Sequence, residues 1–211
     1  MRSSPRSPDK RSRLTPEVRR EQIAEAAARL VLDQGHLPLS LEALARSAGV
    51  SKALIYAYFP SQHALFNTLL SREFEVLAAR GVIDASRGTS LNQASLDCAL
   101  IYFEHVASTG PLIHIILRDA YMAGHVEAQV AGFRDRIILR IARLARRDLQ
   151  LSAKENIAAV NLIITIPEEA GRLVHGKELS LERGRSLCRQ LLLASLEAFT
   201  PREQSPSAPR A

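Results

Sequence analysis

The chain has 211 residues, of which 46% are hydrophobic and 24% are charged. This balance is that of a globular protein with enough apolar material for a packed core, and it excludes a fibrous chain or one that is disordered throughout. The formal net charge of +6 favours a polyanionic partner. Cys98 and Cys188 lie far apart and match no metal-binding or redox spacing, so we expect two free thiols.

The sequence has no signature of a targeting or membrane segment. The N-terminal arginines are not followed by an apolar run, as they would be in a signal peptide. No apolar stretch approaches the ~20 residues that a membrane-spanning helix needs. We therefore expect a cytoplasmic protein.

A polar arm opens the chain. Residues 1–14 are rich in Ser, Pro and Arg, and we predict that they are disordered. The first helix is predicted to begin after Thr15, whose hydroxyl can cap it, because Pro16 suits the first helical position. Gly35 is expected to end this helix.

Two short helices are predicted next. Ser40 caps the first of them, Gly49 can supply the positive φ of a tight turn, and Ser51 caps the second. Two short helices joined by a turn that contains glycine form a helix-turn-helix, whose second helix enters the major groove of DNA. On spacing alone, the alternative is an ordinary helical hairpin with partly buried tyrosines.

The rest of the chain also has helical periodicity. A fourth helix is predicted from Ser61 to Arg80, followed by a break over residues 81–90. Five more helical patterns follow, at 91–108, 111–122, 125–150, 154–175 and 180–199. Pro167 is expected to kink its helix and bow it around a cavity. No region alternates with period two over a convincing length, so the prediction is an all-α fold of about nine helices, with a disordered tail over residues 201–211.

The run from Arg20 to Leu65 resembles the N-terminal domain of the TetR/AcrR family of bacterial transcriptional regulators. The matching pieces are IAEAA followed by DQG, then LARSAGVSK, and then IYAYFPS with AL after it. The resemblance implies a helix-turn-helix DNA-binding domain over residues 15–64 and a ligand-binding and dimerisation domain over residues 65–200. It also implies a homodimer, joined through the last two helices, that binds a palindromic operator. A small molecule bound in the second domain would release the homodimer from the operator.

The family motif places the expected DNA contacts on particular residues. By position, Ser40, Ser51 and Tyr56 would bond phosphates. The residues that would face bases or groove walls are Lys52, Ala53, Leu54, Ala57 and Tyr58. Gln62 stands where the family usually has a lysine that contacts phosphate, so this anchor is neutral here. Leu54 stands where a small residue is common, and its apolar side chain could read a thymine methyl group.

The resemblance also implies a pocket among the fourth to eighth helices. The expected lining residues are Phe74, Tyr102, Phe103, Ile113, Leu117, Tyr121, Phe133 and Ile137, with His114, Arg118 and Asn161 as polar contacts. Ordinary core packing is the alternative for each of them. Because the set is mostly aliphatic and aromatic, we expect an apolar or amphipathic effector. Arg118 would favour an acid over a cation if its side chain points inward.

Three further expectations complete the prediction. Residues 1–20 carry seven Arg or Lys side chains, which would either follow the DNA backbone or stay solvated. His105, His114 and His125 are spread too loosely for a metal site, and we expect no metal and no cofactor.

No motif has the spacing of a catalytic site, so we expect that the protein is not an enzyme. A helical adaptor that binds protein and not DNA is the alternative function.

Overall fold

The computed structural model describes residues 15–149 and 151–199, and these residues form helices and no strand. The predictions on residues 1–14 and 201–211 lie outside this range. The elements are α1 (Pro16–Gln34), α2 (Leu41–Ala48), α3 (Lys52–Tyr58), α4 (Gln62–Ala79), α5 (Val82–Ala85), α6 (Leu91–Thr109), α7 (Leu112–Arg118), the 3-10 helix η1 (Ala120–Met122), α8 (Ala128–Leu149), α9 (Ala153–Ile163), α10 (Thr165–His175) and α11 (Leu181–Phe199).

The all-α prediction is confirmed, but the predicted number of about nine helices is too low. The short helix α5 lies in the segment predicted as a break. The pattern over 111–122 divides into α7 and η1, because the Asp119 side chain caps η1 by accepting a hydrogen bond from the Tyr121 N–H at 2.9 Å. The pattern over 154–175 also divides, into α9 and α10.

Pro167 explains the division between α9 and α10. Proline has no N–H to donate to the carbonyl one turn earlier, and its ring clashes with that carbonyl. The helical hydrogen-bond pattern is accordingly interrupted at Ile164, three residues before the proline, although Ile164 keeps right-handed helical dihedrals with φ −64° and ψ −18°. The prediction that Pro167 disturbs the helix is correct, but the outcome is two separate helices and not one kinked helix. Pro167 lines a cavity, as the predicted bowing requires.

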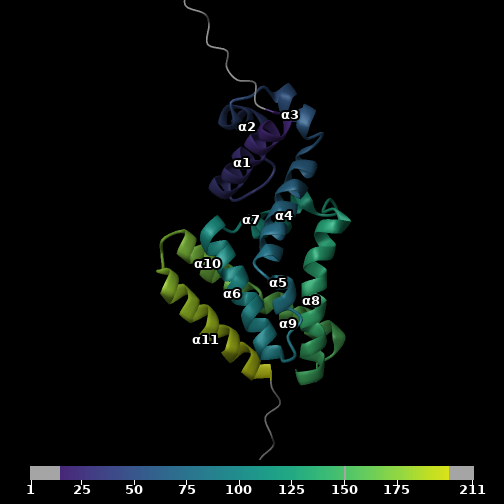
Figure 1. The fold of residues 1–211 in the computed structure, drawn as a ribbon, viewed down its shortest axis with the longest axis vertical. Helices are drawn as coiled ribbons and strands as arrows, with labels where there is room; N and C mark the ends of the chain where they lie inside the picture. Colours follow the sequence, from purple (N-terminus) through teal and green to yellow (C-terminus); the bar gives the residue numbers. More distant parts are fainter. Residues whose placement is uncertain (1–14, 150, 200–211) are drawn as a thin grey trace, which may run out of the picture.

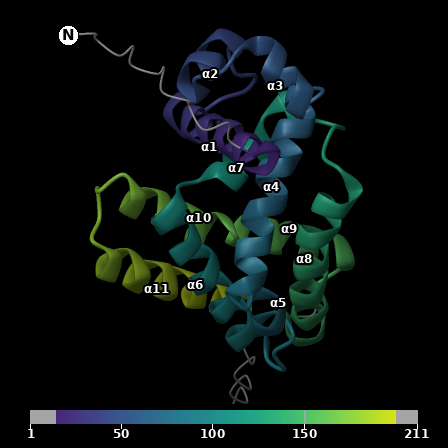
Figure 2. The same ribbon diagram turned by 45° about the horizontal axis from the view of Figure 1, so that its top comes forward.

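The helices form a head and a body (Figure 1). We call α1 to α3 the head and the helices from α5 onward the body, and α4 runs from one into the other. In the body, α6 packs against α10 and α11 on one side and contacts α8 on the other (Figure 2). One apolar cluster spans the head and the adjoining part of the body and includes Ile23, Leu44, Phe59 and Phe66.

Local sequence signals account for the helices of the head. Thr15, Ser40 and Ser51 each cap a helix with the side-chain oxygen, as predicted. Gly35 and Gly49 end α1 and α2 in the left-handed conformation, with φ of 71° and 62°. That conformation costs glycine little, because glycine has no Cβ.

The close packing of α10 on α6, and of α11 on α10, depends on two glycines. A Cβ on Gly171 would lie 2.6 Å from the Val106 Cβ, and one on Gly184 would lie 2.4 Å from the Val174 Cγ2. Both distances are far below van der Waals contact, so only glycine allows these helices to approach so closely.

In the described ranges, no single helix is both long enough and apolar enough to cross a membrane. Among the residues that the structure describes, one pair of helices, α6 and α7, meets that requirement of length and composition together, and the two are bent by 97° at the break between them.

Candidate DNA-binding surface and ligand cavity

Helix α3 has one buried face and one exposed face. Ser51 caps it by accepting a hydrogen bond from the Leu54 N–H at 3.2 Å. Ile55 and Phe59 are each 2% exposed and fix the helix to the core. Burying such a side chain contributes about 1.5–3 kcal/mol. Tyr56 is 50% exposed.

The predicted DNA-contacting residues of this region share the outer side. Exposed are Ser40, Ser51, Lys52, Ala53, Tyr56 and Ala57, while Leu54 and Tyr58 are half-buried. Ser40 lies at the start of α2, where its hydroxyl accepts a hydrogen bond from the Ala43 N–H at 3.3 Å and donates one to Glu42 at 3.1 Å. The outer face of α3 is thus exposed at Lys52, Ala53, Tyr56 and Ala57.

Lys52 has a partner that the sequence analysis missed. Its ammonium group forms an ion pair with the Glu42 carboxylate across the helix-turn-helix. The hydrogen bond from Lys52, with further bonds from the Glu42 backbone and Ser40, lowers the pKa of Glu42 to about 2. Any anion that approaches Lys52 must therefore compete with Glu42 for its charge.

Gln62 holds the head together instead of pointing outward. Its amide nitrogen donates to the Leu39 carbonyl at 2.9 Å, and its amide oxygen accepts from the Leu39 N–H at 2.9 Å. Because both amide groups are paired with one peptide unit, the side chain anchors the segment before α2 to α4. Gln62 thus has a positioning role that the sequence did not indicate, and its contact with a phosphate stays a prediction.

The described part of the basic arm is likewise tied to the head. The Arg20 guanidinium lies 4.8 Å from the centre of the Phe59 ring and donates to the Thr68 hydroxyl at 3.0 Å. Arg19 donates to Gln22 at 2.8 Å. These two arginines stabilise the head. The other basic residues of the arm lie outside the described residues.

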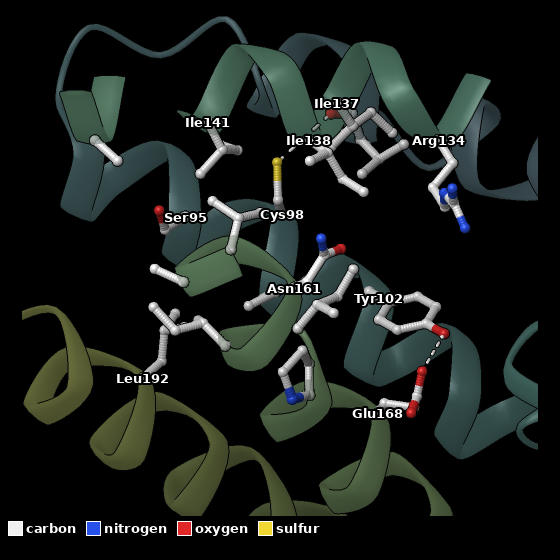
Figure 3. Close-up of a pocket in the computed structure, with 18 of the residues that line it drawn as sticks. Ser95, Cys98, Tyr102, Arg134, Ile137, Ile138, Ile141, Asn161, Glu168 and Leu192 are labelled. Atoms are coloured by element: carbon white, nitrogen blue, oxygen red, sulfur yellow. Dashed lines mark hydrogen bonds between the residues drawn. The ribbon is translucent and has the colours of Figure 1, made fainter. Parts of the chain in front are cut away.

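A cavity of about 440 Å³ lies in the body. Figure 3 shows its lining, with side chains from α6, α8, α9, α10 and α11 pointing into one space. Seven of the predicted lining residues are among those that line it: Tyr102, Ile113, His114, Leu117, Arg118, Ile137 and Asn161. The volume falls within the range of small-molecule sites.

Four predicted lining residues are not among those that line the cavity. Phe74 and Phe133 stack on each other between α4 and α8, with ring centroids 4.9 Å apart. Phe103 is fully buried and packs on the α10 and α11 side of α6. Tyr121 stacks on His63, 4.4 Å between centroids. These four residues were expected from their residue type, but each lies on a side of its helix that points away from the cavity.

The cavity has a polar end. The Tyr102 hydroxyl donates to the Glu168 carboxylate at 3.1 Å, and His114 forms an ion pair with the same carboxylate. Burial raises the pKa of Glu168, although His114, the Tyr102 hydrogen bond and the nearby positive charge of Arg118 oppose the rise. Burial also raises the pKa of Tyr102 well above its ordinary value. Glu168 was missed by the sequence analysis, and its one signal is an acid directly after Pro167.

The remaining walls are mainly apolar, with Arg134 of α8, Asn161 of α9 and Ser95 of α6 as polar exceptions. On α6, positions 95, 98, 99 and 102 face the cavity, a helical stripe of Ser, Cys, Ala and Tyr. Three small side chains on this stripe leave room that larger residues would fill. Burial raises the pKa of the Cys98 thiol to about 12, so it stays neutral. Opposite walls come from aliphatic residues of α8 and α11, among them Ile138, Ile141 and Leu192.

The three histidines weighed for a metal site lie in three different settings. The buried His105 ring pairs with Glu73 at 2.8 Å, His114 pairs with Glu168, and His125 stacks on His63 at 3.9 Å between centroids. Within residues 15–149 and 151–199, no group of three or more His, Cys, Asp or Glu side chains is placed to hold a metal ion.

The head and the body are joined by polar contacts beside the cavity. Asp119 directly follows the cavity residue Arg118, and its carboxylate accepts a hydrogen bond from the Leu37 N–H in the head at 2.8 Å. Asn67 on α4 donates to the His125 carbonyl at 2.8 Å and accepts from the Glu127 N–H at 2.9 Å. Helix α4 and the α7–η1 junction thus both connect the cavity region to the helix-turn-helix.

Known proteins share both the sequence of the head and the fold. A family model described as bacterial regulatory proteins of the tetR family matches residues 23–69. The HTH-type transcriptional activator FasR of Mycolicibacterium smegmatis is 29% identical over 155 residues, which are 72% of this chain and 70% of that protein. The HTH-type transcriptional repressor KstR of Rhodococcus jostii is 29% identical over 127 residues, 58% of each chain.

Similarity of fold extends over most of the chain. A TetR-like transcriptional regulator from Rhodococcus sp. RHA1 superposes with a TM-score of 0.64 at 22% identity, covering 88% of this chain and 99% of that one. The head of the chain thus matches the tetR family of bacterial regulatory proteins in sequence, and the chain as a whole shares the fold of a TetR-like regulator.

Proposed function

We propose that this protein is a ligand-responsive transcriptional repressor that works in the cytoplasm. As a homodimer it binds a palindromic operator through α3, and a small apolar or amphipathic molecule in the cavity releases it. The observation that carries the proposal is that an exposed α3 and a cavity of about 440 Å³ occur in one chain and are linked by α4 and Asp119.

On the DNA side, the outer face of α3 enters the major groove. Ser40, Ser51 and Tyr56 bond phosphates, and Lys52 with its small neighbours Ala53 and Ala57 meets the bases. Small side chains at these two positions allow the helix to approach the base edges closely. Phosphate contacts fix the orientation and the base contacts choose the sequence.

The dimer forms through the outer faces of α10 and α11. Along α11, Cys188 and Leu192 are buried at 0% and 1% exposure, whereas Leu191 is 54% exposed. Leu181, at the start of the same helix, is 56% exposed. A partner that covers these leucines supplies the apolar burial that the single chain lacks. It also places two copies of α3 for half-sites about 34 Å apart.

Ligand and operator are coupled through α4 and α7. A ligand that moves Arg118 also moves Asp119, whose carboxylate holds the Leu37 peptide of the head. A ligand that displaces the cavity residue Leu77 acts on the far end of α4. Either shift changes the angle of the head, and the two α3 helices then no longer match successive major grooves.

The lining favours an amphipathic acid. Glu168 is already paired with His114 and hydrogen-bonded by Tyr102. Arg118 makes no ion pair within the part of the chain that the structure describes, so its charge is available to a ligand carboxylate. The other walls are mainly aliphatic and suit an apolar chain or ring system.

A titration of both partners tests this proposal. Because binding free energies are reciprocal, an effector that weakens operator binding by a given factor is itself bound more weakly by the same factor in the presence of operator, typically 5–150-fold. Lauric acid is a suitable first probe, with operator affinity measured by fluorescence anisotropy and acid affinity by calorimetry at fixed salt. An acid that binds while leaving operator affinity unchanged is not an effector.

The adaptor alternative has no support in the described surface or in the relatives. FasR and KstR carry the names of DNA-binding transcriptional regulators. Salt-dependent retention on nonspecific DNA separates the two functions: a regulator is released as the salt concentration rises, since it displaces counterions from phosphates, whereas an adaptor is not retained.

A further inference from the structure

The apolar end of the cavity contains one polar atom that has no partner. Ser95, on α6, is 7% exposed, and its hydroxyl has no hydrogen-bond partner among the described residues. It lines the cavity next to Leu91, Ile141 and Leu192. A buried hydroxyl without a partner costs free energy, so it calls for an explanation.

Other hydroxyls on helices of this protein avoid that cost. Thr68 donates to the Ala64 carbonyl at 2.9 Å, Ser108 to the His105 carbonyl at 2.9 Å and Ser195 to the Leu191 carbonyl at 2.7 Å. Such bonds to the preceding turn are the ordinary solution for a serine or threonine in a helix. Ser95 has the same opportunity, and its hydroxyl is instead left for another partner in the cavity.

Ser95 lies at the opposite end of the cavity from the polar group around Glu168. Figure 3 shows Ser95 at one end of the space and Tyr102 with Glu168 at the other, with Cys98 and Asn161 between them. Ser95 and Tyr102 are seven residues apart on α6 and both line the cavity, which at 1.5 Å per residue separates them by about 10 Å. An elongated ligand would reach both ends.

We propose that Ser95 is a second polar subsite of the cavity, which binds a hydroxyl or carbonyl group at the far end of an elongated apolar carboxylic acid. The acid's carboxylate lies beside Arg118, and its apolar chain runs along the small side chains of α6. This inference rests on the proposed function, because it names the class of molecule that the ligand cavity takes.

The experiment compares saturated acids of increasing chain length with and without a terminal hydroxyl, lauric and ω-hydroxylauric acid among them. Binding to the full-length protein is measured by calorimetry below the micellar concentration. The wild type is expected to prefer the hydroxylated acid about three- to tenfold at the chain length that reaches Ser95, the gain of one hydrogen bond.

Two variants complete the design. Ser95→Ala should bind lauric acid as the wild type does, lose the preference for the terminal hydroxyl, and have a melting temperature no lower than the wild type. Ser108→Ala, on the same helix and exposed, should keep the preference. The proposal is overturned if no chain length shows a preference, if Ser95→Ala retains it, or if Ser95→Ala is clearly destabilised, since the hydroxyl then has another partner.

Operator binding, measured in the same samples, separates this inference from the proposed function. Release of operator by lauric acid without any hydroxyl preference overturns the Ser95 subsite and supports the proposed function. Operator binding that neither acid changes, while a hydroxyl preference that depends on Ser95 is measured, supports the subsite and overturns the proposed release of operator by an acid.

Discussion

At the residue scale, the Lys52–Glu42 pair determines how much charge α3 offers to DNA. Both side chains are exposed, at 50% and 56%, so the pair adds little to stability. Under the proposed function its consequence is for DNA binding, because Glu42 would compete with phosphate for the ammonium group.

Glu42→Gln should therefore strengthen binding to both operator and nonspecific DNA. It should also steepen the dependence of log affinity on log salt by up to about 0.9, the contribution of one released counterion. Lys52→Ala should weaken operator binding by about 1–3 kcal/mol with an unchanged melting temperature. Anisotropy titrations across a salt series measure the DNA affinity of both variants and its salt dependence. Unchanged affinities in both variants would rule out contact between Lys52 and DNA.

Glu168 makes stability depend on pH with a definite sign. Burial raises the pKa of this carboxyl above its unfolded value. A group with a raised pKa contributes stability at pH below the unfolded value of about 4.3 and loses that contribution as the pH rises through the folded value. Glu168→Gln should thus gain melting temperature relative to the wild type as the pH rises from about 4 to 7.

The neighbouring acid is the matched control. The hydrogen bond from Arg172 lowers the pKa of Glu169, so its contribution is present above the unfolded value and is lost as the pH falls. Glu169→Gln should therefore lose melting temperature at neutral pH, and the loss should shrink in acid. The same trend with pH in both variants would contradict the assignment of Glu168 to the buried end of the cavity.

At the element scale, α6 organises the body because its faces differ. One face meets α10 and α11 at the two glycines Gly171 and Gly184, and another presents the small residues Ser95, Cys98 and Ala99 to the cavity. The tight packing on one side is a consequence of glycines on α10 and α11, and the room on the other side is a consequence of the small side chains of α6 itself.

Gly171→Ala should push α10 away from α6. The new Cβ would meet the Val106 Cβ at 2.6 Å and the Phe103 carbonyl oxygen at 2.9 Å, and overpacking of this kind costs about 1–3 kcal/mol of unfolding free energy. Urea unfolding measures the loss of unfolding free energy.

Gly132→Ala on α8 is the control. A Cβ at this position meets nothing within 4 Å, so the higher helix propensity of alanine should stabilise the protein by up to about 1 kcal/mol. Equal effects would show that the close approach is relaxed in solution.

At the scale of the whole molecule, the exposed leucines of α11 predict the assembly. Leu191→Arg would place an unpaired charge where a partner chain buries an apolar surface, which is costly. The variant should sediment as a monomer or aggregate and lose most of its operator affinity. Leu139→Arg alters a leucine on α8 that is 44% exposed and should remain dimeric. A wild-type protein that sediments as a monomer at micromolar concentration would exclude this arrangement.

Much of the head could be predicted from the sequence because its signals are local. Thr15, Ser40 and Ser51 cap helices within three residues of their own positions, and Gly49 sets its turn by its own φ. Of the side chains expected to face bases or groove walls, Lys52, Ala53 and Ala57 are exposed, whereas Leu54 and Tyr58 are half-buried. These features depend on the chain within one or two turns.

Distant contacts could not be predicted in this way. The pairing of Gln62 with Leu39, of Lys52 with Glu42 and of Glu168 with His114 joins helices that a linear pattern cannot orient. The aromatic residues show the limit most clearly: Phe74 and Phe103 were plausible cavity residues by type, and each faces other neighbours.

The sequence by itself thus determined the all-α class, the helix-turn-helix and the outward side chains of α3, because capping, glycine conformation and helical period act over a few residues. Only the tertiary structure decided which face of α6 borders the cavity, that Glu168 and Ser95 stand at its two ends, and that Asp119 ties it to the head. Those features depend on how helices rotate and approach one another, and close packing between segments far apart in the chain sets that arrangement.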